Sequence, residues 1–165
     1  MTDGFRVGLG FDFHPFGQDR RLVLGGVRIP HPLGLLGHSD ADALLHAVID
    51  ALLGAAGLRD IGTWFPDTDP AYRDSSSRML LENAYERVRD RGFAVVNLDI
   101  TVLAEAPRIQ PHVDAMKANL ARLLSMEPGR IGLKATTMEG CGPIGRGEGI
   151  AVQAVVLLVR SKREA

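Results

Sequence analysis

Three side chains in the first third of the chain have the types and the spacing of a zinc site. Asp12 and His14 lie two residues apart in an alternating segment, and a strand directs such a pair to one face of its sheet. His46 lies on the polar flank of an apolar helical pattern. Two imidazoles and one carboxylate are three protein ligands for zinc, with the fourth position open for a substrate. We therefore expect a metal centre at these residues.

The alternative for His46 is a hydrogen-bonded surface histidine, because spacing alone does not bring residues 14 and 46 together. Asp50 follows His46 by one helical turn. A carboxylate at that position is expected to accept the second ring N–H of His46 and to fix the tautomer of the ring.

Two further segments have the residue types of a phosphate site. His38 and Ser39 precede the expected helix, whose free N–H groups and dipole favour an anion, although Ser39 also suits a plain helix cap. The second segment, residues 134–149, combines two hydroxyls, a carboxylate and an arginine with several glycines. These four residues are Thr136, Thr137, Glu139 and Arg146. The alternative is that the glycines only form a turn between two strands.

Strands and helices must position these residues. Alternating or apolar runs predict strands over residues 5–13, 93–104, 131–137 and 150–159. In the run of residues 93–104, the side chains expected to face one way are those of Val96, Leu98, Ile100 and Val102. Gly25 and Gly26, between two short apolar runs, predict a tight hairpin.

Three helices are expected. The first is capped by Ser39 with Asp42 completing a capping box, and it ends near Gly54 and Gly57. The second spans residues 75–91, and the third starts at Pro111. The inward residues of the second helix are expected to be Met79, Leu80, Ala84 and Val88. Residues 58–73 are rich in Gly, Pro and Asp, which predicts a loop.

Composition limits the possible functions. The chain has 165 residues and a formal net charge of -1, which argues against a nucleic-acid binder. The longest apolar run is too short to cross a membrane. A single cysteine, Cys141, and an N-terminus without signal-peptide features suit a cytoplasmic protein. We expect residues 1–165 to form one α/β (α+β) domain, a sandwich with helices covering one face of a sheet. The nearly all-apolar last strand predicts self-association through the other face.

Taken together, the motifs resemble the 2-C-methyl-D-erythritol 2,4-cyclodiphosphate synthase family of non-mevalonate isoprenoid biosynthesis. The resemblance covers about residues 5–160 and depends on the combination of motifs rather than on any one. In chain order the matching segments are residues 8–14, 25–30, 38–46, 50–56, 60–62, 65–70, 106–107, 134–137 and 145–150.

The resemblance implies a homotrimer with active sites between neighbouring subunits. It implies a lyase that converts 4-diphosphocytidyl-2-C-methyl-D-erythritol 2-phosphate to the 2,4-cyclodiphosphate and CMP. Asp12, His14 and His46 match the family's zinc ligands, and Glu139 matches the ligand of a second divalent ion, Mg2+ or Mn2+. His38 and the hydroxyl-bearing Thr137 match the catalytic residues that orient the phosphates.

Other positions match the family's substrate contacts. Those to the methylerythritol part are Asp60, Ile61, Gly62, Phe65, Pro66, Asp67, Thr68 and Asp69. Those to cytidine are Ala104, Pro107, Arg108, Ile109, Gln110 and Thr136. The remaining members of the substrate-binding set are Asp12, His14, His38, Ser39, Thr137, Met138, Glu139, Pro143 and Arg146.

The sequence departs from the family pattern at two places. Arg108 replaces a lysine, which keeps the charge and changes the geometry toward a phosphate. Residues 140–144 differ from the version with an aromatic residue at position 143, so Pro143 alters the expected lining of the trimer's central cavity. Two alternatives stay open: a zinc phosphodiesterase or nucleotidase, and a non-catalytic trimeric module held by zinc.

Overall fold

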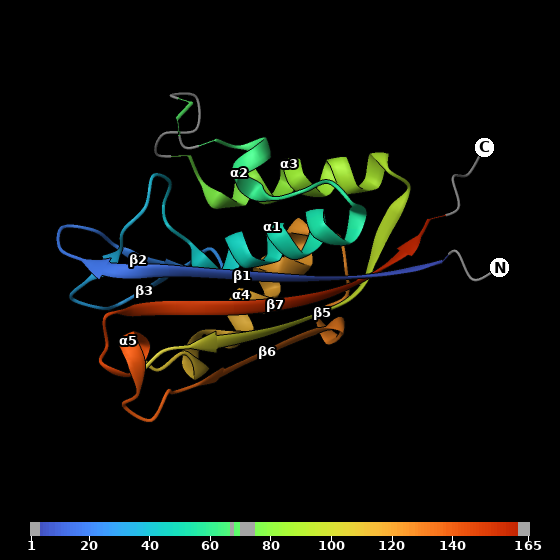
Figure 1. The fold of residues 1–165 in the computed structure, drawn as a ribbon. Coiled ribbons are helices and arrows are strands. Elements are labelled where there is room, and N and C mark those ends of the chain that lie inside the picture. The colour runs from blue at the N-terminus through green and yellow to red at the C-terminus, as the bar shows by residue number, and fades with distance from the viewer. Residues whose placement is uncertain (1–3, 67, 70–74, 162–165) are drawn as a thin grey trace.

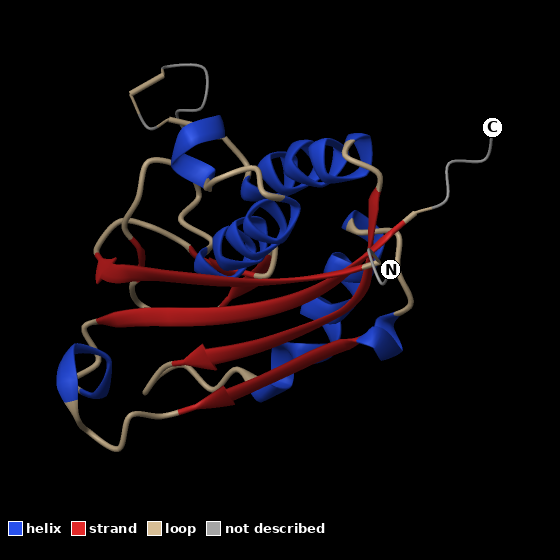
Figure 2. Ribbon diagram, turned by 45° about the vertical axis from the view of Figure 1, so that its right-hand side comes forward, coloured by secondary structure: helices blue, strands red, loops and turns tan. Residues whose placement is uncertain are grey.

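The computed structural model describes residues 4–66, 68–69 and 75–161, and its centre is a five-stranded sheet (Figure 1). The strand order is β4-β1-β7-β5-β6, with β5 and β6 parallel and the other neighbours antiparallel. The strands are β1 (Phe5–Gly17), β4 (Gly34–Leu35), β5 (Phe93–Leu103), β6 (Ile131–Thr136) and β7 (Gly149–Arg160). All four long strands expected from the sequence are confirmed. The longer helices gather on one face of this sheet and leave the other open (Figure 2).

Strand β1 turns its small residues toward the helices. An added Cβ would lie 1.9 Å from the Ala51 carbonyl oxygen at Gly8 and 1.9 Å from the Ala47 carbonyl oxygen at Gly10. Only glycine therefore allows the helix α1 (Ala43–Ala56) to approach this strand so closely. The large apolar side chains of β1 alternate to the open face, where they are 58% to 69% exposed: Phe5, Val7, Leu9 and Phe11.

Helix α1 is the central helix, packed between the sheet and α3 (Ser77–Asp90). It is buried nearly all round, so its apolar surface is wider than the helical pattern with a polar flank that the sequence predicts. Its cap is Asp42, whose side chain accepts from the backbone N–H of Leu45. The prediction that Ser39 caps the helix is wrong, because the chain from Ser39 to Asp42 is not yet helical. Gly57 ends the helix with a left-handed φ of 71°.

Asp42 also fixes the predicted hairpin, β2 (Leu22–Leu24) and β3 (Val27–Ile29). Gly25 and Gly26 both adopt left-handed φ angles, 58° and 69°, which a two-residue turn of this kind requires. Their backbone N–H groups donate to the buried Asp42 carboxylate at 2.9 Å and 2.6 Å. One carboxylate thus satisfies donors from both the hairpin and the start of α1.

The second and third helices follow the sequence with corrections. In α3 the buried residues include Leu80, Ala84 and Val88, whereas Met79 is 45% exposed and its predicted inward position is wrong. Pro111 lies in a 3-10 turn (Gln110–His112) that leads into α4 (Val113–Leu123). The remaining short elements among the described residues are α2 (Ile61–Trp64), a 3-10 turn (Pro128–Arg130) and α5 (Gly142–Gly145).

Two local expectations fail for identifiable reasons. The predicted loop of residues 58–73 contains α2, because Asp60 caps a helical turn by accepting from the Thr63 N–H. In β5 the buried residues are Phe93, Val95, Leu98, Ile100 and Val102, so the prediction that Val96 faces the same way as Leu98 is wrong. An irregularity between Val95 and Asn97 shifts the register and turns Val95 inward instead.

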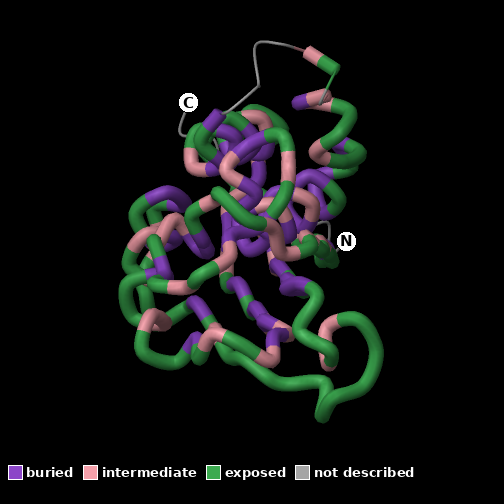
Figure 3. Tube along the Cα trace, turned by 90° about the vertical axis from the view of Figure 1, so that its left-hand side faces the viewer, coloured by how far each residue is buried: buried purple, intermediate pink, exposed green. Residues whose placement is uncertain are grey.

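Buried residues concentrate between the sheet and the helices (Figure 3). The glycine-containing connection from β6 to β7 lies outside this core and is mostly exposed. None of the helices described is long and apolar enough to cross a membrane.

Candidate active site

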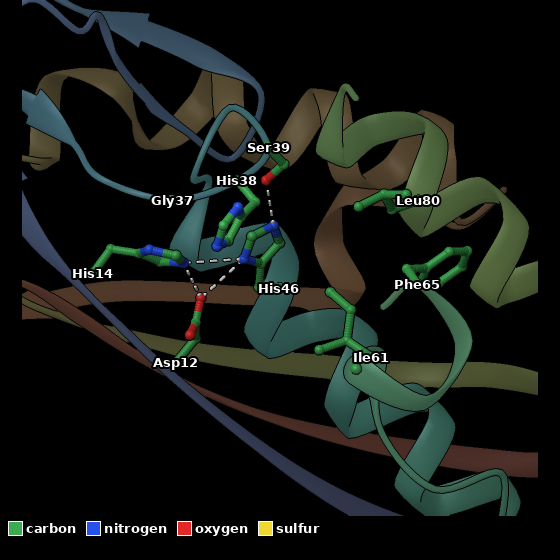
Figure 4. A pocket seen from close by; sticks show the side chains of 10 residues that line it. Asp12, His14, Gly37, His38, Ser39, His46, Ile61, Phe65 and Leu80 are labelled. Carbon is green, nitrogen blue, oxygen red and sulfur yellow. Dashed lines mark hydrogen bonds and ion pairs between the residues drawn. The ribbon is translucent and has the colours of Figure 1, made fainter. Parts of the chain in front are cut away.

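Asp12 and His14 from β1 meet His46 from α1 at one point (Figure 4). Asp12 Oδ2 lies 2.9 Å from His14 Nε2 and 3.1 Å from His46 Nδ1. The two ring nitrogens are 3.2 Å apart. This meeting depends on the close approach of α1 to β1, because Gly10 contacts Ala47, the neighbour of His46. The predicted group of three possible metal ligands is confirmed among the described residues.

Contacts on the far side of each ring indicate which nitrogen faces the group. His14 Nδ1 lies 2.6 Å from the Leu36 carbonyl, which only accepts, so Nδ1 donates and Nε2 presents its lone pair. His46 Nε2 lies 2.9 Å from Ser77 Oγ. With the proton on Nε2, His46 also presents a lone pair at Nδ1. Two nitrogen lone pairs and a carboxylate oxygen then converge, an arrangement that fits a divalent metal ion.

The electrostatics of the group also favour positive charge. Burial opposes ionisation of Asp12, but hydrogen bonds and attraction from His14 and His46 outweigh it, so the pKa of Asp12 lies well below its ordinary value. Burial acts against a charged His14, yet the Asp12 carboxylate raises the pKa of His14 above its ordinary value. Asp12 therefore stays ionised and attracts a cation to this point.

The expected role of Asp50 is wrong. Its carboxylate accepts from the Ile61 backbone N–H at 2.7 Å, at the start of α2. The second ring nitrogen of His46 instead contacts the hydroxyl groups of Ser77 at 2.9 Å and Ser39 at 3.2 Å. The helical spacing was correct, but the ring of His46 is turned toward α3. Burial raises the pKa of Asp50 against the opposing hydrogen bond from Ile61.

The metal group opens into a cavity of about 330 Å³. His38 and Ser39 line it, and Figure 4 shows the His38 ring beside His14 and His46. Arg20 holds this segment by donating to the Gly37 carbonyl at 3.0 Å and the Ser39 carbonyl at 2.5 Å. The sequence predicted that His38 and Ser39 lie at the N-terminus of the helix, and this is wrong. The Asp42 carboxylate occupies that end of α1 instead.

Helix α2 forms the opposite wall with Ile61, Gly62 and Phe65. Hydrogen bonds from Thr63 lower the pKa of the exposed Asp60 carboxyl below its ordinary value. Trp64 donates to the Leu58 carbonyl at 2.6 Å, and the Arg87 guanidinium lies 4.2 Å from the centre of its ring. These contacts fix α2 against α3.

The predicted loop after α2 is only partly described. The Asp69 N–H donates to the Pro66 carbonyl at 3.0 Å, and Thr68 is exposed. Asp67 lies outside the described residues.

A second cavity, of about 450 Å³, lies at the ends of β5 and β6. It gathers the residues that match cytidine contacts, together with Thr137. Glu105, which also lines it, accepts from the backbone N–H of Met138 at 2.8 Å. The predicted residues in this cavity are Ala104, Pro107, Arg108, Ile109, Gln110 and Thr136.

Within one chain the second cavity and the metal group have no lining residue in common. Glu139 is exposed, accepts from the Thr137 hydroxyl at 2.8 Å, and is not part of the described metal group. Arg146 is also exposed and donates to Glu148 at 2.6 Å. Met138 and Pro143 are exposed as well. Among the described residues of a single chain, the predicted site residues therefore do not form one continuous site.

Four residues near the metal group were missed by the sequence reasoning. Leu80 lines the first cavity, and Arg20 anchors the loop around His38. Ser77 and Asp40 form hydrogen bonds behind His46. Asp40 lies within the matching segment 38–46, but its contact to Ser77 joins segments 37 residues apart, and no spacing marks Arg20, Ser77 or Leu80 as site residues.

Proteins similar to this chain are cyclodiphosphate synthases. A curated relative from Bordetella pertussis, named 2-C-methyl-D-erythritol 2,4-cyclodiphosphate synthase, is 59% identical over 161 residues, 98% of this chain and 99% of the relative. A solved structure of a 2C-methyl-D-erythritol-2,4-cyclodiphosphate synthase in a CDP-bound form superposes with a TM-score of 0.86 at 41% identity, covering 93% of this chain and 99% of the solved chain.

The bifunctional IspDF from Campylobacter jejuni has a TM-score of 0.91 at 47% identity, covering 94% of this chain but 42% of the longer protein. The family model that matches is that of the YgbB family, over residues 5–159. The resemblance drawn from the motifs is thus confirmed over nearly the whole sequence, and the chain belongs to the YgbB family.

Proposed function

We propose that this chain converts 4-diphosphocytidyl-2-C-methyl-D-erythritol 2-phosphate to 2-C-methyl-D-erythritol 2,4-cyclodiphosphate and CMP. The observation that carries the proposal is the convergence of Asp12, His14 and His46 beside an open cavity. The relatives named as this synthase match from end to end, which supports the same substrate. We further propose that residues 1–165 act as one synthase domain.

The chemistry needs positioning more than covalent help. The 2-phosphate of the substrate attacks the β-phosphorus of the same molecule, the bond to the CMP oxygen breaks, and the ring closes. Holding two reacting groups in line saves up to about 7–11 kcal/mol of entropic cost. In such transfers the protein mainly orients phosphates and neutralises charge. No side chain is required as a nucleophile.

The metal residues fit a zinc ion. Asp12, His14 and His46 would hold Zn2+, and Glu139 would hold Mg2+ or Mn2+ with the substrate's phosphates. These ions would act as Lewis acids that polarise phosphoryl oxygens. Donor chemistry supports the assignment, because neutral imidazoles and a carboxylate are common zinc ligands.

The protein's own residues bind and orient. His38 and Thr137 would orient the phosphates, with Ser39, Met138 and Arg146 near them. Toward methylerythritol, the residues at α2 and its following loop would form the wall: Asp60, Ile61, Gly62, Phe65, Pro66, Asp67, Thr68 and Asp69. The second cavity would bind cytidine, and Arg108 in this cavity would contact a phosphate of the substrate. Its proposed contacts are Ala104, Pro107, Arg108, Ile109, Gln110 and Thr136.

The separation of the two cavities supports a homotrimer with sites between neighbours. The first cavity of one subunit would face the second cavity of the next. The apolar open face of β1 supports this assembly, since exposed patches of large apolar side chains mark interfaces. Pro143 would lie near the centre of such a trimer.

The test is product analysis by phosphorus NMR with Mg2+ and trace Zn2+. We expect cyclic diphosphate and CMP from the native protein. In His46→Ala the activity should fall by about 100-fold or more, because loss of an outer partner of a ligand already costs about 10–100-fold and this variant loses the ligand itself. His31→Ala is the matched control, because His31 lines neither cavity and contacts Phe16 and Leu33 instead.

Two results would overturn the proposal. CMP with an open-chain bisphosphate would identify a phosphodiesterase or nucleotidase that uses water in place of the internal phosphate. Absence of turnover with zinc bound would leave a non-catalytic zinc-binding module.

A further inference from the structure

A chain of hydrogen bonds lies behind His46 and begins on a different helix. Ser77 is the first residue of α3 and is fully buried. Its hydroxyl oxygen lies 2.9 Å from His46 Nε2. On its other side the same hydroxyl donates to Asp40 Oδ1, and the Ser77 N–H donates to Asp40 Oδ2 at 3.1 Å. Asp40 therefore holds Ser77 through two hydrogen bonds.

The direction of this chain follows from the donor and acceptor types. An ionised carboxylate can only accept, so the single proton of the Ser77 hydroxyl points to Asp40. The hydroxyl then presents only lone pairs to His46, and Nε2 of the ring must be the donor. The neutral ring with its proton on Nε2 has its free lone pair on Nδ1. Nδ1 is the atom that meets Asp12 and His14.

Ser39 provides a second, weaker contact at the same nitrogen. Its hydroxyl oxygen lies 3.2 Å from His46 Nε2 and 3.5 Å from Ser77 Oγ. The Ser39 oxygen also accepts from the Ala41 N–H at 3.2 Å. Ser77 is therefore the closer partner and the one tied to a carboxylate.

We propose that Ser77 and Asp40 are positioning residues of the metal centre. Asp40 orients the Ser77 hydroxyl, Ser77 accepts the Nε2 proton of His46, and the ring is held with Nδ1 toward the cation. His14 needs no such device, because the Leu36 carbonyl holds its Nδ1 proton. The inference rests on the proposed metal site and adds α3 to the elements that build it.

The first experiment measures zinc affinity by competition with a chromophoric chelator. Ser77→Ala removes the acceptor, and loss of such an outer partner costs about 10–100-fold in metal affinity. Ser76→Ala is the matched control, because Ser76 is exposed and its side chain makes no cap hydrogen bond. We expect native affinity in Ser76→Ala and weaker binding in Ser77→Ala. Equal affinities in the two variants would overturn the inference.

His46→Ala in the same assay separates this inference from the proposed function. If the native protein binds zinc no more tightly than His46→Ala, the metal site itself fails. If the native protein binds tightly and Ser77→Ala does too, only the positioning role fails. Denaturant unfolding of each zinc-free variant identifies conditions under which all are folded, so that affinities are compared between folded proteins.

Asp40→Asn tests the direction of the hydrogen bonds that join Asp40, Ser77 and His46, and it leaves the volume of the side chain at position 40 nearly unchanged. The carboxamide carries donors, so one of the two contacts to Ser77 loses its acceptor, and the Ser77 hydroxyl is free to turn toward His46. We expect weaker zinc binding here as well. In the zinc-free protein at pH 8, nitrogen-15 NMR should show the Nε2–H tautomer of His46 in the native chain and a tautomer mixture in Asp40→Asn. Native affinity together with an unchanged tautomer would refute the proposed polarity.

Discussion

At the scale of single residues, the two histidines of the metal group are fixed by different partners. His14 donates to a backbone carbonyl of the segment after β4, at 2.6 Å from Leu36 O. His46 contacts a buried hydroxyl on α3. Each ring is thereby tied to an element other than its own. The geometry of the group therefore depends on the packing of four segments: β1, the segment after β4, α1 and α3. A shift of any one of them changes the distances between the ligand atoms.

Asp50 gives a pH-dependent prediction at the same scale. Burial raises its pKa, so the folded-state value lies above the unfolded value. Its contribution to stability is then fully present below the unfolded pKa and is lost as pH rises through the folded pKa. Asp50→Asn keeps an acceptor for the Ile61 N–H but cannot ionise. We expect the variant to gain stability relative to the native chain as pH rises from 3 to 7.

Urea unfolding of zinc-free protein across that range measures this difference. Asp60→Asn is the opposite control, because hydrogen bonds from Thr63 lower the pKa of Asp60. A lowered pKa contributes stability above the unfolded value that is lost as pH falls. The two variants should therefore change with pH in opposite directions. Parallel curves would contradict the assignment.

The sequence predicts contacts between site residues reliably only where the residues are close together in the chain. Asp12 and His14 share a strand face, so their pairing follows from a two-residue period. The addition of His46 depended on a long-range contact that the sequence suggested through its residue types alone. Asp50 was assigned to His46 from helical spacing, but spacing does not determine ring rotation. Ser77 has no local signal, because its role exists only when α3 packs on α1.

At the scale of elements, the contact between β1 and α1 sets the site. Two glycines on β1 face the helix, and backbone atoms of α1 occupy the space in which side chains would stand. The alternation predicted the strand correctly. It did not indicate which face meets the helix, because large apolar residues usually face the core. Here the glycine face is inside and the large residues lie on the open face.

Gly10→Ala tests this contact. Its Cβ would lie 1.9 Å from the Ala47 carbonyl oxygen and 2.7 Å from the Ala51 nitrogen, both rigid backbone atoms of α1. We expect a loss of about 3 kcal/mol in the free energy of unfolding, the upper part of the usual range for overpacking. Since Ala47 adjoins His46, zinc affinity should fall as well. Chemical denaturation and chelator competition measure the two effects.

Gly54→Ala, on the helix α1 that Gly10 approaches, is the control. Position 54 has nothing within 4 Å of an added Cβ, and it lies inside α1. Alanine there should stabilise the protein by up to about 1 kcal/mol, because glycine is the poorer helix former. If both substitutions had the same effect, the close approach at Gly10 would not be what limits α1.

At the scale of the whole molecule, a single chain exposes apolar side chains to water on the open face of its sheet. Leu9 of β1 pairs with Val155 of β7, and both are exposed, at 59% and 41%. Toward β5 and β6 the same face becomes polar, with Asp99 and Lys134 joined at 2.5 Å. The sequence predicted self-association from the apolar last strand. The structure assigns most of the exposed apolar area to β1 instead, because the inward half of β7 is covered by helices.

Leu9→Glu tests the assembly proposed for this face. A carboxylate at that position would have to be desolvated in the interface of each subunit, whereas in a single chain it would remain in water. We expect sedimentation velocity to show a trimer for the native protein and monomers for Leu9→Glu. Synthase activity should fall with assembly, because each site would draw its two cavities from different subunits. Met79→Glu is the matched control, since Met79 is 45% exposed but lies on α3, away from the open face. A Leu9→Glu protein that remains trimeric would exclude the β1 face from the interface, and an active monomer would show that one chain forms a complete site.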